Sequence, residues 1–141
     1  MSAKTKTLII TLLVAIPALL TGQTIWPPAI GLARPTTAEL PFFIFLAVIE
    51  SLALGLGVSF AIFGWKYISH LTAPDKNRAL AAYLCIIWQL VSWWPHDNLH
   101  QHIGTDLHRL LGIEYGFHLT LILSSLILAW IFTGVVKEKL D

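Results

Sequence analysis

Residues 41–65 are PFFIFLAVIESLALGLGVSFAIFGW, an apolar stretch in which Glu50 is the one charged side chain. An α-helix rising ~1.5 Å per residue needs roughly 20 such residues to cross the ~30 Å hydrocarbon core of a bilayer. Three further stretches, 8–26, 79–94 and 113–136, are also apolar and almost free of charge. The stretch at 79–94 is short and must draw on its neighbours to cross. The sequence therefore predicts an all-α integral membrane protein, a four-helix bundle.

The composition agrees with this interpretation. Apolar residues make up 56% of the 141-residue chain and charged residues 12%, about half the charge of an ordinary soluble domain. A soluble fold of this size could not bury so much apolar surface, so the lipid bilayer is the expected partner. The chain is interpreted as one transmembrane domain, 1–141. The net charge of +1 argues against nucleic acid, and one cysteine excludes an internal disulfide.

Basic residues set the expected orientation, because lysine and arginine concentrate in cytoplasmic segments. Of the nine basic residues, only Arg34 and Arg109 fall on the side of the predicted spans that is expected to be non-cytoplasmic. The first apolar stretch is interpreted as an uncleaved span, so both termini are expected in the cytoplasm of a multi-pass protein of the cell membrane. The basic residues on the cytoplasmic side would be Lys4, Lys6, Lys66, Lys76, Arg78, Lys137 and Lys139.

Each predicted span carries one stripe of small or polar residues at helical spacing. Helices in a bilayer meet through small residues while large apolar side chains face lipid, so each stripe is expected to line the bundle interior. The stripes are Thr7, Thr11, Ala15, Ala18 and Gly22; Glu50, Ala53, Gly57, Ala61 and Gly64; Cys85, Gln89, Ser92 and His96; and Glu114, His118, Ser125 and Ala129.

Glu50 is the carboxylate that lies deepest in an apolar span. A charged side chain at the bilayer centre costs at least ~2.5–3.5 kcal/mol on insertion scales, so Glu50 should face a partner or a cavity. Counted at ~1.5 Å per residue from the outer boundary, it lies ~12 Å deep, and Gln89 and His118 lie ~8 Å deep. We expect a polar cluster in the outer half of the membrane.

Five of the six histidines lie between residues 96 and 118. Pro95 suits the first turn of a helix, and we expect a short helix from Pro95 to about Leu111, with Gly104 as a candidate break. Leu99, Ile103, Leu107 and Leu110 would form its apolar face, so the helix is predicted to lie along the outer interface between spans three and four. His96 and His100 would then point toward the bundle or the lipid, while His102 lies near the edge and His108 on the wet side.

Histidines four residues apart on a helix can offer two ligands to one metal ion. The expected ligand set is His96, His100 and His118, with oxygen from Glu50, Asp97 or Glu114, and His102 as a further candidate. Neutral imidazole with carboxylate suits copper, zinc or iron. Asp97 and Asp106 could instead orient the imidazole rings through their N–H groups. Haem, held by His118 with His96 or His100, is the less favoured cofactor.

Several functions fit these features. The first is a metal-binding subunit or accessory of a membrane redox complex. The alternatives are a small proton- or cation-coupled transporter subunit that uses Glu50, and a purely structural subunit of a larger membrane complex. The histidines could also form a hydrated interfacial loop or sense pH. Other membrane subunits or further copies of the chain are expected partners. Enzymatic activity is left open, and without a nucleophile triad or phosphate-binding loop it would have to depend on a metal.

Overall fold

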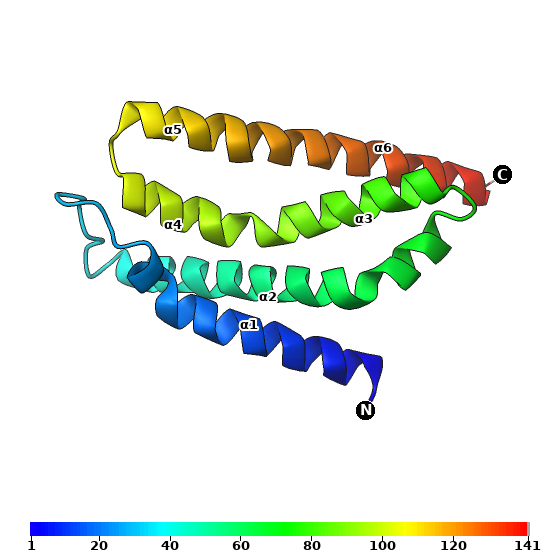
Figure 1. Cartoon of the computed structure of the whole chain (residues 1–141), viewed down its shortest axis with the longest axis horizontal. Helices are drawn as coiled ribbons and strands as arrows, with labels where there is room; N and C mark the ends of the chain where they lie inside the picture. Colours follow the sequence, from blue (N-terminus) through cyan, green and yellow to red (C-terminus); the bar gives the residue numbers. More distant parts are fainter. Residues whose placement is uncertain (141) are drawn as a thin grey trace.

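The chain folds as a series of α-helices in a computed structural model that describes residues 1–140, and no strand occurs in that part. Figure 1 shows the arrangement of these helices. The all-α class is therefore confirmed. In chain order the elements are α1 (Ala3–Ile25), α2 (Leu40–Leu71), α3 (Lys76–Val91), α4 (Trp93–Ile103), α5 (Leu107–Ile113), the π-helical segment η1 (Glu114–Leu119) and α6 (Thr120–Leu140).

Three helical stretches are long and apolar enough to cross a membrane: α1, α2 and the continuous segment Leu107–Leu140, which joins α5, η1 and α6. These stretches contain the predicted spans 8–26, 41–65 and 113–136, apart from Trp26, which caps α1. The third predicted span corresponds to α3, whose 16 residues extend only ~24 Å at ~1.5 Å per residue. It is too short to cross alone, as its sequence length indicated.

Each helix packs mainly against its neighbours in the chain, so the helices form a single row. α1 contacts α2, α2 contacts α3 and α4, and α3 contacts α6, whereas α1 and α6 share no substantial contact in residues 1–140. Figure 1 shows them one beneath another in a layer. A closed bundle, in which the first and last helices also meet, is not what the described chain forms. The row leaves large apolar side chains exposed along α1, α2 and α6.

The packing between α1 and α2 follows the predicted small-residue stripe of the first span. Thr11, Ala15, Ala18 and Gly22 are the buried residues of α1. On α2, a Cβ on Gly55 would come 2.2 Å from the backbone oxygen of Thr11. The backbones of these two helices therefore approach so closely that only glycine fits at position 55.

The second span does not follow the one-stripe prediction, because α2 lies inside the row and has a neighbour on each side. Gly55 faces α1, but a Cβ on Gly57 would meet Leu90 and Val91 of α3 at 2.9 and 2.6 Å. Gly57 and Gly64 of the predicted stripe are buried, whereas Ala61 is exposed. A helix in a row needs two opposite contact faces, so a single stripe could not describe α2.

A small apolar core closes one end of the row, where α2 ends and α3 begins. Ile68, Ala79, Ala82, Ile131 and Val135 pack there. Arg78 Nη1 donates to Glu138 Oε1 at 2.7 Å and joins the start of α3 to the end of α6. The start of α1 and the end of α6 lie at this end of the molecule (Figure 1). The histidine segment lies at the other end.

Candidate metal centre

The helix that carries His96 and His100 begins earlier and runs in a different direction than predicted. α4 starts at Trp93 and ends at Ile103, so the helix expected from Pro95 to about Leu111 is wrong as one unit. Gly104 ends α4 with φ +61°, a conformation that favours glycine. The expected break is therefore confirmed. In Figure 1 α4 continues the line of α3 instead of crossing the end of the row.

The ligand on the last helix is positioned by η1, a wider helical turn between α5 and α6. Such π-helical turns are rare and occur frequently at functional sites. Trp88 of α3 stacks on Phe117 of η1 at a ring separation of 5.8 Å, and the Trp88 indole donates to Thr120 Oγ1 at 3.0 Å. These contacts fix η1 against the α3–α4 line, so that His118 faces α4.

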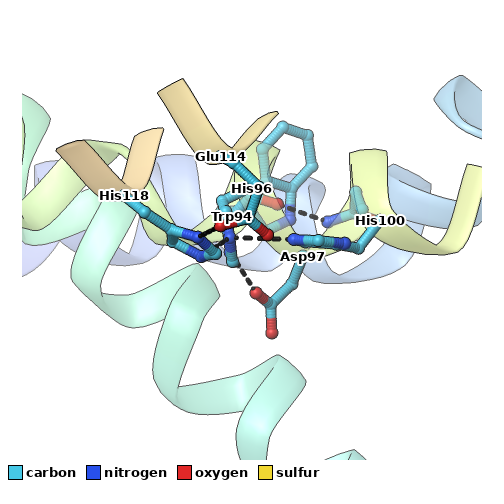
Figure 2. Close-up of polar contacts among 7 residues, drawn as sticks. Trp94, His96, Asp97, His100, Glu114 and His118 are labelled. Atoms are coloured by element: carbon cyan, nitrogen blue, oxygen red, sulfur yellow. Dashed lines mark hydrogen bonds and ion pairs between the residues drawn. The ribbon is translucent and has the colours of Figure 1, made fainter. Parts of the chain in front are cut away.

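Three imidazole rings meet at this end of the row. His96 Nε2 lies 2.7 Å from His118 Nε2 and 3.1 Å from His100 Nε2. One nitrogen from each ring can be chosen so that all three lie within 4.8 Å of one another. His96 is buried, with 6% of its surface exposed, and the other two are half-buried. Figure 2 shows the three rings gathered between α4 and the helix that carries His118.

The outer nitrogens of two of these rings contact carboxylates. His96 Nδ1 lies 2.6 Å from Asp97 Oδ1, and His118 Nδ1 lies 2.6 Å from Glu114 Oε2 (dashed lines in Figure 2). A carboxylate only accepts hydrogen bonds, so each Nδ1 is the nitrogen that carries hydrogen. In the neutral rings the Nε2 atoms of His96 and His118 then have free lone pairs, and these lone pairs face each other at contact distance.

Two opposed lone pairs repel unless a positive charge lies between them. An added proton on one ring or a metal ion would supply that charge. Histidine that binds a metal through one nitrogen and donates the other N–H to a carboxylate is the usual arrangement in metal sites. Ligands on a tetrahedral zinc ion, with Zn–N bonds of ~2.0–2.1 Å, lie about 3.3 Å apart. The Nε2 atoms of His96 and His118, now 2.7 Å apart, would thus separate by about half an ångström on binding a metal. Side-chain rotation can provide this movement.

His100 is the third ring, and its environment favours the neutral form. Burial lowers the pKa of His100 below its ordinary value of 6.5, and the neighbouring His96 lowers it further. A neutral imidazole is the form that binds a metal ion. At neutral pH this ring is therefore uncharged, and one of its two nitrogens has a lone pair that can bind a metal ion.

The other predicted site residues lie outside the three-ring cluster. Asp97 and Glu114 touch its outer nitrogens. His102 contacts the backbone oxygen of Pro27 through Nδ1 at 2.8 Å. Asp106 accepts from the backbone N–H groups of His108 and Arg109 and so caps α5. In the described residues Asp106 forms no hydrogen bond with a histidine ring, because its carboxylate contacts backbone N–H groups and Arg109 at the start of α5.

Glu114 contacts the outer nitrogen of His118, whereas the sequence suggests Glu114 as a direct oxygen ligand of the metal. Glu114 and His118 are four residues apart on one helical segment, and this spacing brings their side chains together. That spacing was the signal for an outer carboxylate. Glu50 lies on α2, close enough to Asp97 for their carboxyl groups to interact, and thus one step further from the rings.

Comparisons with protein-family models, with curated proteins and with solved structures find no match. The function must therefore be inferred from the site itself.

Proposed function

We propose that this protein is a membrane protein that binds a transition metal ion through His96, His100 and His118. The observation that carries the proposal is the convergence of three imidazole nitrogens, two of them on rings whose outer N–H group contacts a carboxylate. Three histidines leave a fourth position open on a tetrahedral ion, the arrangement found in catalytic rather than structural zinc sites. That position would accept water or a ligand from another subunit.

Copper, zinc and iron all suit imidazole ligands, and copper or iron would supply redox chemistry. The geometry does not favour haem. Two axial nitrogens would have to lie on opposite faces of the macrocycle, and the 2.7 Å between His96 Nε2 and His118 Nε2 leaves no space for a ring between them.

We further propose that the chain acts as a subunit or accessory of a larger membrane complex, with both termini in the cytoplasm. The open row supports this proposal, because its first and last helices, α1 and α6, do not close against each other in residues 1–140, and each leaves a face free for lipid or for another subunit. A neighbouring subunit or a second copy of the chain could cover either face.

Metal analysis of the detergent-solubilised full chain tests the proposal. The protein is purified without chelators, incubated with zinc, copper(I) or iron(II), desalted and analysed by mass spectrometry. We expect about one ion per chain, consistent with one three-ligand site, and loss of binding in His118→Ala. His108→Ala is the matched control, since His108 is exposed and lies outside the cluster. Equal metal content in the two variants, or none in the unmodified protein, would refute the metal site.

A further inference from the structure

A second polar site lies beside the histidine cluster, in a cavity of about 240 Å³ between α1, α2 and α4. This volume is below the ~300–1,000 Å³ of sites for drug-sized ligands, so its occupant must be small. The polar side chains that line it are Gln23, Glu50, Ser51, Asn98 and Gln101.

Ser51 shows that the cavity is incomplete in the protein alone. Its side chain is buried, with 2% of the residue exposed, and its Oγ has no hydrogen-bond partner. A buried hydroxyl without a partner costs about 1–3 kcal/mol, so such groups are normally satisfied by protein, water or ligand. Ser51 lines the cavity, so rotation of its side chain toward the cavity would let a molecule inside it become the partner of the hydroxyl.

The carboxyl group of Glu50 lines the cavity. Among residues 1–140, no lysine, arginine or histidine forms an ion pair with it. A carboxylate in a membrane-spanning helix is costly unless it faces a partner or a cavity. A cation in the cavity would give Glu50 that partner.

The remaining lining groups favour a cation with N–H donors over a bare metal ion. Asn98 donates its amide N–H to the backbone oxygen of Trp94, which leaves Asn98 Oδ1 as an acceptor above Gly22. Trp94, whose indole packs against that of Trp26 at a ring separation of 5.1 Å, is also among the residues that line the cavity. An indole attracts organic cations through its ring face. Acceptor oxygens beside an indole suit a donor-rich cation.

We propose that this cavity binds a small monovalent cation of the ammonium or guanidinium class, through the Glu50 carboxylate and the Ser51 hydroxyl. The proposal does not require a metal at the histidine cluster, because His96, His100 and His118 do not line the cavity. In a transporter such a cavity would be the place where the carried cation binds.

Equilibrium binding of radiolabelled methylammonium to the detergent-solubilised full chain tests this proposal. We expect saturable binding that guanidinium displaces. Sodium and tetramethylammonium, which carry no N–H group, should compete weakly. Competition by sodium as strong as that by guanidinium would overturn the assignment of an N–H donor, and an absence of saturable methylammonium binding would overturn the site.

Variants of α2 locate the binding. Glu50→Gln should weaken it by about tenfold or more, because a charge-assisted hydrogen bond is lost, and Ser51→Ala by about two- to tenfold. Ser59→Ala is the matched control, because Ser59 is also a buried serine without a partner but does not line the cavity. If Glu50→Gln does not fold, Ala47→Leu fills the cavity and keeps every polar group. Unchanged binding in both Ser51→Ala and Ala47→Leu would refute the location.

His118→Ala separates this proposal from the metal site. The variant should lose the metal and keep methylammonium binding, since His118 does not line the cavity. Loss of methylammonium binding from folded His118→Ala would contradict a separate cation site. Failure of metal binding with methylammonium binding intact would refute the metal site alone.

Discussion

Replacement of Glu114 measures how much a carboxylate outside the ligand set contributes to metal binding. Glu114 Oε2 lies 2.6 Å from His118 Nδ1, where it fixes the tautomer of the ring and raises its basicity. Removing such an outer partner typically weakens metal binding by about 10–100-fold, or about 1.4–2.7 kcal/mol. The Glu114 side chain is 52% exposed, so solvent screens part of the charge and the lower half of this range is expected.

Two substitutions at this position separate charge from hydrogen bonding. Glu114→Gln keeps an acceptor for the Nδ1–H group and should lose about tenfold in affinity, whereas Glu114→Ala loses both the charge and the acceptor and should lose about 30-fold. The assay is competition for zinc against a chromophoric chelator, with detergent-solubilised full chain at pH 7.5. Glu138→Gln is the control, because that carboxylate pairs with Arg78 at the other end of the row.

Two results would refute this reasoning. Unchanged affinity in Glu114→Ala would show that the carboxylate does not orient His118. Complete loss of zinc binding in Glu114→Gln, equal to that in His118→Ala, would show that Glu114 binds the ion directly, as one of the interpretations from the sequence proposed.

Three further outcomes are expected. The pKa of His100 lies below 6.5 in the folded chain, so the unfolded state binds more protons than the folded state on acidification. The melting temperature of the metal-free protein should therefore decrease as the pH is lowered below about 6.5, and it should decrease less steeply in His100→Asn. An equal pH dependence of the melting temperature in the two proteins would contradict this. Gly55→Ala should destabilise the α1–α2 contact by about 1–3 kcal/mol in thermal unfolding, whereas Gly112→Ala, with no atom within 4 Å of the new Cβ, should not. Gln89→Leu removes hydrogen bonds from Nε2 to α6, including that to Ser124 at 2.7 Å, and should cost about 1 kcal/mol; an unchanged melting temperature would show that these bonds do not hold α3 to α6.

Much of the fold could be predicted because helical spans have a local cause. A run of apolar residues such as 41–65 becomes a helix because every backbone hydrogen bond can then be made within the segment. The stripe of small residues on α1 could be predicted for the same reason, since α1 has one major neighbour and needs one contact face.

The errors arose where the position of a helix in the assembly decides its contacts. α2 has neighbours on two sides, and nothing in its own sequence distinguishes a row from a closed bundle. The direction of α4 also depends on its neighbours, because helical spacing alone does not specify that α4 continues the line of α3.

The sequence by itself determined the all-helical class, the apolar stretches able to cross a membrane and the histidines most suited to bind a metal. These properties follow from composition and from spacing along one helix. Only the tertiary structure decided which atoms meet. The contact between His96 and His118 joins residues 22 positions apart, through a π-helical turn and the packing of Trp88. The difference between ligand and outer carboxylate depends on which nitrogen of each ring faces inward, and helical spacing cannot specify that.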